Sequence, residues 1–187
     1  MENRQNAHRS SIVLDIVHIG LMAAIIFVAT SIIHVKTYMG VLHAGDSMVF
    51  LAAILLRRNK AVLASAIGMT MFDLANGYVT WAPFTLVIKA VMAYIAATIA
   101  YRGEYKGHNV RNNITGFAIS GVWMIIAYYF GQVVILMFLS DDKQTLAQSL
   151  LVSLKDVPTN IIQVIVGILI AVPLIKQIRK TNIKERM

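Results

Sequence analysis

The chain has 187 residues, of which 58% are hydrophobic and only 14% are charged, and its formal net charge is +8. Soluble domains have about half apolar and about a quarter charged residues, so this composition excludes an ordinary soluble domain and indicates a membrane protein. The absence of cysteine excludes a disulfide framework and a thiolate metal site.

Six apolar segments follow one another along the chain. A bilayer core of about 30 Å needs roughly 20 helical residues, so the length allows six short spans. We therefore predict an all-α membrane protein in which residues 1–187 form one bundle of six transmembrane helices. The second and third segments are short, and together they also fit one re-entrant hairpin. The predicted spans are residues 12–33, 44–56, 61–75, 82–101, 114–139 and 158–175.

The first span carries a stripe of small residues. Gly20 and Ala24 are four residues apart and Val28 follows one turn later, so the three share one helix face. Small residues allow two helix backbones to approach closely in a membrane. The stripe therefore predicts a surface for helix contact.

The sequence HAGD, residues 43–46, opens the second span. As a structural feature, Asp46 would cap the N-terminus of that helix. As a functional feature, His43 and Asp46 would line the mouth of a binding site.

The polar segment DLANGYVTWAP, residues 73–83, joins the third and fourth spans. Asn76 and Gly77 both accept a positive φ and together predict a turn. Asp73 is a candidate acceptor for a ligand amine. Trp81 belongs either to an interfacial aromatic belt or to a stacking wall for a planar heteroaromatic ligand.

Lys89 lies about two turns inside the fourth span. An ionisable side chain at that depth is costly and is usually paired or functional. We consider three interpretations: Lys89 donates to a bound ligand, it forms a structural ion pair with Asp73, or its long side chain extends to the membrane surface.

Polar residues also occur in the last two spans. Tyr128 and Gln132 are four residues apart on one helix face, and Asn160 and Gln163 are three apart on another. These side chains would form hydrogen bonds either to neighbouring helices or to a ligand.

The distribution of positive charge predicts the orientation. A six-span arrangement puts 13 of the 17 Lys and Arg residues on the side that holds both termini. The positive-inside rule makes that side cytoplasmic, so we predict a multi-pass protein of the cell membrane with both termini in the cytoplasm. The outer side collects the polar segments 34–46, 73–83 and 140–160.

Signatures of enzymes are missing from the sequence. It lacks the G-x-x-x-x-G-K-S/T of ATP-binding loops, the H-E-x-x-H of zinc proteases and the G-x-S-x-G of serine hydrolases. The five histidines are scattered without metal-site spacing. We therefore predict no enzyme activity, no catalytic residue, no metal and no cofactor.

Two long segments carry a resemblance to a known family. LHAGDSMVFLAAILL (42–56) and LASAIGMTMFDLANGYVTWAPFTLVIKA (63–90) resemble the S component, the substrate-binding subunit, of bacterial energy-coupling factor (ECF) vitamin transporters. The H-x-G-D, D-L-x-x-G and W-A-P-F-T-L-x-I-K elements look closest to members of the hydroxymethylpyrimidine type, which take up a thiamin precursor. Pyridoxine-type members are a near second.

The resemblance implies that a vitamin or precursor binds on the outer side of the bundle. It also implies docking onto a membrane T component, carried by two cytoplasmic ABC ATPase subunits whose ATP hydrolysis topples the S component inward. The family docks through an A-x-x-x-A motif on its first helix, for which Gly20, Ala24 and Val28 are the nearest match here. The candidate substrate-binding residues are Asp73, Asn76, Trp81, Lys89, Tyr128, Gln132, Asn160, His43 and Asp46.

Two other functions remain open at this point. A small membrane enzyme acting on a lipid or isoprenoid would need an acidic or histidine cluster at the inner interface, where the chain offers only Asp15 and His18. A structural subunit of a larger assembly would need no ligand.

Overall fold

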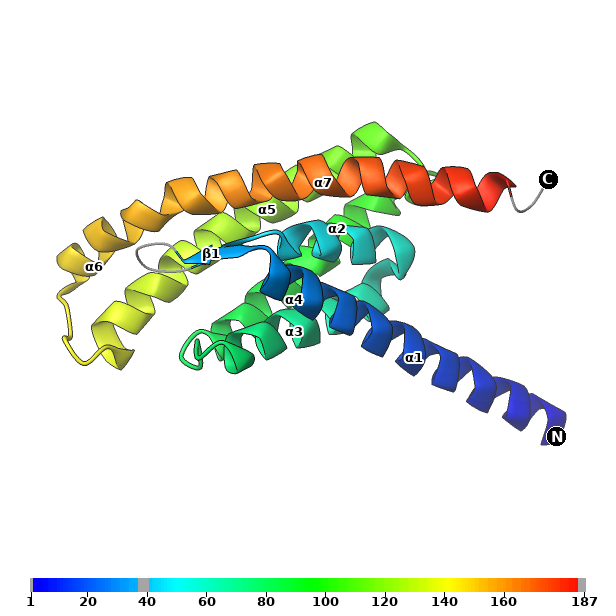
Figure 1. The fold of residues 1–187 in the computed structure, drawn as a ribbon, viewed down its shortest axis with the longest axis horizontal. Helices are drawn as coiled ribbons and strands as arrows, with labels where there is room; N and C mark the ends of the chain where they lie inside the picture. The colour runs from blue at the N-terminus through cyan, green and yellow to red at the C-terminus, as the bar shows by residue number, and fades with distance from the viewer. Residues whose placement is uncertain (1, 37–40, 185–187) are drawn as a thin grey trace.

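The computed structural model describes the backbone of residues 2–36 and 41–184 and the side chains of residues 11–35 and 41–181, and it is mostly helical (Figure 1). Residues 37–40 of the predicted outer loop and the side chains of Arg4, Arg9, Lys184 and Arg186 lie outside that part. The helices are α1 (Glu2–Ile32), α2 (Gly45–Leu55), α3 (Arg57–Ala75), α4 (Ala82–Ala100), α5 (Val110–Val134), α6 (Leu146–Ser153) and α7 (Val157–Lys184). A π-helix (Ile135–Leu139) continues α5, a 3-10 helix (Leu154–Asp156) joins α6 to α7, and β1 (His34–Lys36) pairs antiparallel with β2 (Val41–His43).

A helix covers each of the six apolar segments, but the helices differ in length. Within the described residues, four helical stretches are long and apolar enough to cross a membrane: Ser11–Ile32, Ala82–Ala100, Val110–Leu139 and Leu146–Thr181. The 11 residues of α2 extend only about 17 Å. The first and last helices are longer than predicted, because polar residues extend both beyond their apolar cores.

A tight turn reverses the chain between α2 and α3. Leu56 alone separates the two helices, and Arg57 has a φ of 63°, which is unusual for a residue with a side chain. The Tyr101 hydroxyl donates to the carbonyl of Ile54 at 2.5 Å, and the Arg57 guanidinium lies 5.5 Å from the centre of the Tyr101 ring. Tyr101, at the end of α4, therefore holds both sides of this turn.

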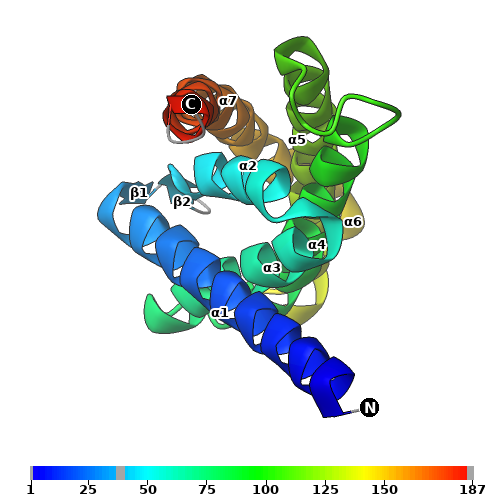
Figure 2. The ribbon, with the colours of Figure 1, turned by 90° about the vertical axis from the view of Figure 1, so that its right-hand side faces the viewer.

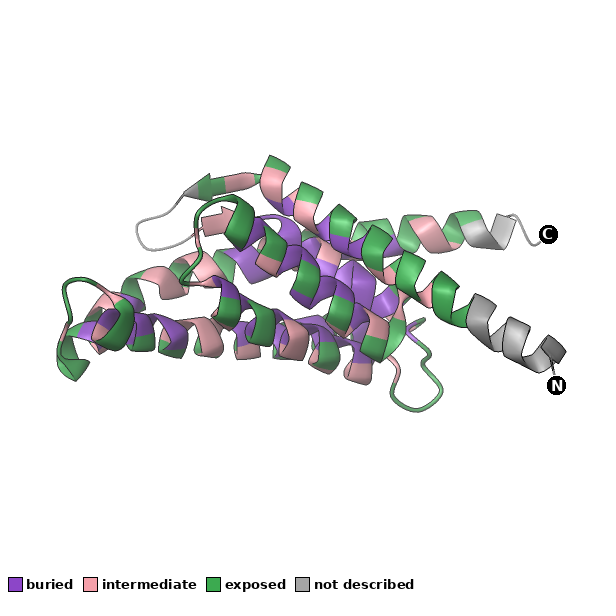
Figure 3. Ribbon diagram, turned by 90° about the horizontal axis from the view of Figure 1, so that it is seen from below, coloured by how far each residue is buried: buried purple, intermediate pink, exposed green. Residues whose placement is uncertain are grey.

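The long helices pack around a shared apolar core. Helix α1 packs on α2 and α3, α4 lies between α3 and α5, and α7 packs on α2 and α5 (Figure 2). Buried residues face the centre of the bundle, whereas the outward face of α1 is exposed and apolar (Figure 3). At the centre, the rings of Phe50 and Phe117 stack with centroids 4.5 Å apart.

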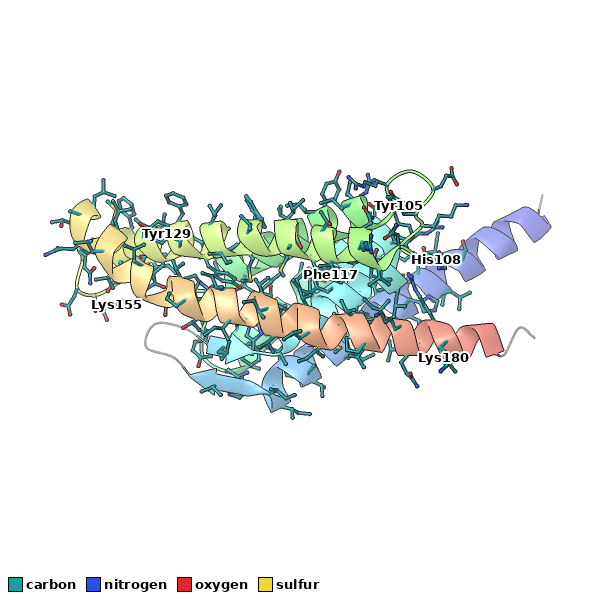
Figure 4. The ribbon with its side chains drawn as sticks, turned by 90° about the horizontal axis from the view of Figure 1, so that it is seen from above. Tyr105, His108, Phe117, Tyr129, Lys155 and Lys180 are labelled. Atoms are coloured by element: carbon teal, nitrogen blue, oxygen red, sulfur yellow. The ribbon has the colours of Figure 1, made fainter. Side chains whose placement is uncertain are left out.

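The two ends of the bundle are formed by different parts of the chain. Both termini lie at one end (Figure 1), and Tyr105, His108 and Lys180 lie toward that end, whereas Tyr129 and Lys155 lie at the other (Figure 4). The basic turn after α2 belongs to the end with the termini, because Lys60 forms an ion pair with Asp15 of α1. The opposite end consists of the β-hairpin, the α3–α4 turn and α6.

Helices α1 and α3 touch closely at Gly68. A Cβ atom there would lie 2.6 Å from the carbonyl oxygen of Ala23 and 2.9 Å from Cβ of Ile26. We expect Gly68→Ala to lower the free energy of unfolding by about 1–3 kcal/mol, because α1 must move off α3. Thermal unfolding in detergent measures the change.

The same substitution at Gly20 is the control. A Cβ at Gly20 would meet no described atom within 4 Å, so Gly20→Ala should leave the melting temperature unchanged or raise it slightly. Equal melting temperatures for Gly68→Ala and the parent would contradict the close packing of α1 on α3.

Candidate ligand-binding site

A cavity lies at the end of the bundle opposite the termini. It holds about 650 Å³ of atom-free space, its open mouth included. Its walls come from β2, the α3–α4 turn, α4, α5 and the region where α6 leads into α7. Six of the nine residues expected from the sequence line it: His43, Asp73, Trp81, Tyr128, Gln132 and Asn160.

The turn after α3 positions one wall of this cavity. Gly77 has a φ of 82°, and the N–H of Tyr78 donates to the carbonyl of Asp73 at 2.8 Å. A left-handed glycine followed by this hydrogen bond is a Schellman motif, which ends a helix sharply. The turn predicted at Asn76 and Gly77 is confirmed, and it brings Asp73 and Tyr78 to the same cavity wall.

Thr85, Tyr128 and Asp73 all line this cavity. The Thr85 and Tyr128 hydroxyls are 3.2 Å apart and share a hydrogen bond in which either oxygen can be the donor. One carboxylate oxygen of Asp73, Oδ2, is buried and has no hydrogen-bond partner among the described residues.

Three further polar atoms in the cavity wall are also buried without a hydrogen-bond partner among the described residues. The Tyr78 hydroxyl, the Gln132 side-chain oxygen and the Ser153 hydroxyl are buried without a partner in the described part of the chain. Buried polar groups in folded proteins are nearly always hydrogen-bonded. Four such groups around one cavity indicate that its occupant is polar at its edges.

Aromatic rings form the rest of the wall. The Trp81 and Tyr128 ring centroids are 5.6 Å apart, and the rings of Phe72 and Tyr78 stack at 6.2 Å. The His43 ring meets Phe72 edge to face at 5.8 Å. Flat apolar faces beside a few polar groups suit a planar ring with polar substituents.

Three of the expected site residues do not line the cavity. Asn76 is exposed, and its side-chain amide donates to the carbonyl of Phe72 at 2.9 Å, which helps to end α3. Asp46 and Lys89 are fully buried below the cavity and pair with each other at 2.5 Å.

The alternative of a structural Lys89–Asp73 ion pair is therefore wrong, because the Lys89 ammonium pairs with the Asp46 carboxylate instead. The expected N-cap role of Asp46 is also wrong. Ala44 occupies the N-cap position of α2, and the Asp46 carboxylate binds Lys89 and the side-chain amide of Gln163.

Several cavity residues had no place among the expected site residues. Gln163 shares a helix face with Asn160, for which a ligand contact and a helix contact are both expected. Tyr78 lies in the aromatic turn before Trp81, and Thr85 lies one turn before Lys89 on the same helix face, so these two also carry a usable signal. Ser153, Asp156 and Thr159 join the site only through the fold, which packs α6 on α5 and α7 on α5 and β2.

The arrangement of side chains does not support the alternative of a membrane enzyme with an acidic or histidine cluster at the inner interface. Asp15 is paired with Lys60, and His18 lines a separate groove beside Arg57. Among the side chains that the structure describes, no three His, Cys, Asp or Glu residues lie close enough to share a metal ion.

His43 joins the cavity to the α2 N-terminus. The Gly45 N–H donates to its Nδ1 at 3.2 Å. Burial lowers the pKa of the His43 imidazole from 6.5 to about 4; Asp46 opposes this shift and Lys89 adds to it. The ring is therefore neutral in the folded protein at neutral pH.

This depressed pKa predicts acid sensitivity. The unfolded chain takes up a proton at His43 below pH 6.5, whereas the folded chain does so only near pH 4, so the contribution to stability is complete above 6.5 and is lost as pH falls toward about 4. We expect the melting temperature to fall across this window, with a smaller fall in His43→Gln. Melting curves of both proteins across this pH range test this; parallel pH profiles would contradict it.

The chain matches a known protein family over most of its length. Residues 10–180 match the family described as the ECF-type riboflavin transporter, S component, and this range contains every residue of the cavity. A search of curated proteins found no match. The S component is a substrate-binding transporter subunit and not an enzyme, and it works with T and ATPase components. This chain, with its apolar spanning helices and its polar cavity at one end, belongs to the S-component family of ECF-type riboflavin transporters.

Proposed function

We propose that this protein captures hydroxymethylpyrimidine, the thiamin precursor, from outside a bacterial cell and delivers it into an ATP-driven ECF importer. The observation that carries the proposal is the Asp73 carboxylate, buried in an aromatic cavity with one oxygen unpaired among the described residues. A carboxylate in that position accepts a hydrogen bond from an amine or a protonated ring nitrogen.

Hydroxymethylpyrimidine matches the cavity in shape and polarity. Its single flat ring suits the space beside Trp81 and Tyr128, and its amine suits Asp73. Its ring nitrogens and hydroxymethyl group are edge groups that Gln132, Asn160 and His43 are able to bind. A site that leaves its buried polar groups unpaired with the wrong ligand discriminates strongly against that ligand.

Pyridoxine is the second candidate, because it is also a single flat ring with a ring nitrogen and hydroxymethyl groups. Riboflavin, which the family description names, is the third. Neither pyridoxine nor the fused ring system of riboflavin carries an exocyclic amine for Asp73, which favours hydroxymethylpyrimidine.

The arrangement of the two ends supports a transport role. We propose six transmembrane helices in one domain, with the basic end and both termini in the cytoplasm and the cavity facing outward. The T component and two ABC ATPase subunits then supply the energy, and reorientation of this subunit delivers the ligand to the inner side.

The stripe formed by Gly20, Ala24 and Val28 is the proposed docking surface for the T component. All three residues are exposed, whereas α1 uses other residues, among them Ala23 and Ile26, to pack on the bundle. A small-residue stripe that its own bundle leaves free is suited to close contact with another helix.

Ala24→Trp tests this surface. It should abolish co-purification with the T component and the ATPases, because the indole keeps the helices apart, while the dissociation constant for ligand stays unchanged. Ile25→Trp is the control, since Ile25 is partly exposed about 100° around the same helix. Equal co-purification of both variants would contradict docking through the stripe.

The ligand itself is identified by release from the protein. The purified protein is denatured and the freed small molecules are identified by mass spectrometry. The proposal expects hydroxymethylpyrimidine in the parent protein and its loss from Asp73→Ala. Release of riboflavin or pyridoxine instead would reassign the ligand within the same family.

A further inference from the structure

The buried ion pair between Asp46 and Lys89 lies outside the cavity but touches its wall. Both side chains are 0% exposed, and they join α2 to α4. Asp46 accepts from the Gln163 side chain at 2.9 Å, and the Lys89 ammonium lies 5.2 Å from the centre of the Tyr128 ring. Gln163 and Tyr128 both line the cavity, so the pair contacts the site through two of its residues.

The pair fixes the orientation of the Gln163 amide. A carboxylate can only accept, so the nitrogen of Gln163 must face Asp46. The oxygen of Gln163 then accepts from the backbone N–H of His43 at 3.2 Å, which can only donate. The amide therefore has one orientation that satisfies both partners, and it ties the end of β2 to the ion pair.

The hydrogen-bond partners of His43 determine which nitrogen of its ring carries the proton. The Gly45 N–H can only donate, so Nδ1 of the His43 ring carries no proton, and the proton of the neutral ring is on Nε2. Gly45 and Asp46 are adjacent in the first turn of α2, so the pair that anchors Asp46 also anchors this donor. The remaining polar atom of the ring is a hydrogen-bond donor.

Stability alone does not explain a charge pair at this depth. Apolar residues of similar volume in place of a buried ion pair are often neutral or stabilising, because two charges no longer need to be removed from water. The pair is instead placed where it contacts two cavity residues, Gln163 and Tyr128.

We propose that Asp46 and Lys89 are positioning residues that fix Gln163 and His43, so that the cavity offers a hydrogen-bond donor at His43 and selects ligands with an acceptor there. The proposal rests on the proposed function and names what the ligand must carry beside the amine that binds Asp73. For a pyrimidine, that acceptor is a ring nitrogen or the hydroxymethyl oxygen.

The test compares the parent with the double variant Asp46→Leu/Lys89→Met, which removes both charges together. Calorimetric titration measures dissociation constants for hydroxymethylpyrimidine and for two analogues, one with carbon in place of a ring nitrogen and one with methyl in place of hydroxymethyl. In the parent, at least one analogue should bind about tenfold more weakly or worse. In the double variant, the ratio of that analogue's dissociation constant to the dissociation constant of hydroxymethylpyrimidine should fall to near one.

The outcomes separate the two proposals. If the parent binds none of these compounds, the ligand assignment fails; if it binds them and the double variant keeps the parental ratio, the positioning role fails. A loss of affinity that is equal for all three compounds also overturns it, since that is the result of a merely structural pair. Ser120→Ala, a buried hydroxyl that lies outside the cavity wall, is the control and should keep the parental ratio.

A second measurement does not depend on whether the double variant folds. Nitrogen-15 NMR of the parent protein, prepared with nitrogen-15-labelled histidine, reports which ring nitrogen carries the proton. The signal that is missing from the spectrum of His43→Gln is the signal of His43. The proposal expects the proton on Nε2. A proton on Nδ1 would overturn it.

Discussion

Lys89→Met is expected to lower the free energy of unfolding by about 3–5 kcal/mol, the usual loss when one partner of a buried ion pair is removed. The substitution leaves the Asp46 carboxylate charged and fully buried, with the amide of Gln163 as its remaining side-chain partner. Methionine has nearly the volume of lysine, so the loss reports the missing charge and not a cavity. Thermal unfolding of the purified protein in detergent measures it.

Lys60→Met is the matched control for this prediction. It removes the same side chain from a second ion pair, with Asp15, but both partners of that pair are about a third to a half exposed. Exposed pairs contribute roughly 0–1 kcal/mol, so the melting temperature should hardly change. Similar losses in Lys60→Met and Lys89→Met would contradict the buried pair that holds α2 to α4.

Asp73→Ala is expected to weaken ligand binding by about 10- to 100-fold, which is the loss of a hydrogen bond to a charged group of about 1.5–3 kcal/mol. The variant should be as stable as the parent or more stable. It lacks a buried carboxylate, one oxygen of which has no hydrogen-bond partner among the described residues. Titration calorimetry and melting curves of the same preparation measure the two effects separately.

Asn76→Ala is the control, because Asn76 lies three residues away on the same turn but is exposed and outside the cavity wall. Its dissociation constant should equal that of the parent. Unchanged affinity in Asp73→Ala would remove Asp73 from the site, and a matching loss in Asn76→Ala would show that the whole turn, and not the carboxylate, is responsible.

The elements of the fold that depend on local sequence could be predicted. Apolar runs bounded by basic segments located the helices, and Asn76-Gly77 located the turn that ends α3, because each signal lies within a few residues. The β-hairpin and α6 were not predicted. Their strands and helix are short, so they have too few residues to show a hydrophobic period.

The candidate site was predictable where one segment supplies it and not where distant segments meet. Asp73 and Trp81 come from one turn, and both line the cavity. The partner of Lys89 is 43 residues away in sequence, and its choice of Asp46 over Asp73 depends on how deeply α2 and α4 overlap. Sequence spacing gives the depth of a residue along its own helix but not its height relative to another helix.

The most direct test of the central claim is a calorimetric titration of the purified protein in detergent with hydroxymethylpyrimidine, pyridoxine and riboflavin. The account predicts one-to-one binding that is tightest for hydroxymethylpyrimidine and is weakened by Asp73→Ala. No binding of any of the three compounds to a folded parent protein would contradict the claim that this cavity is a vitamin site.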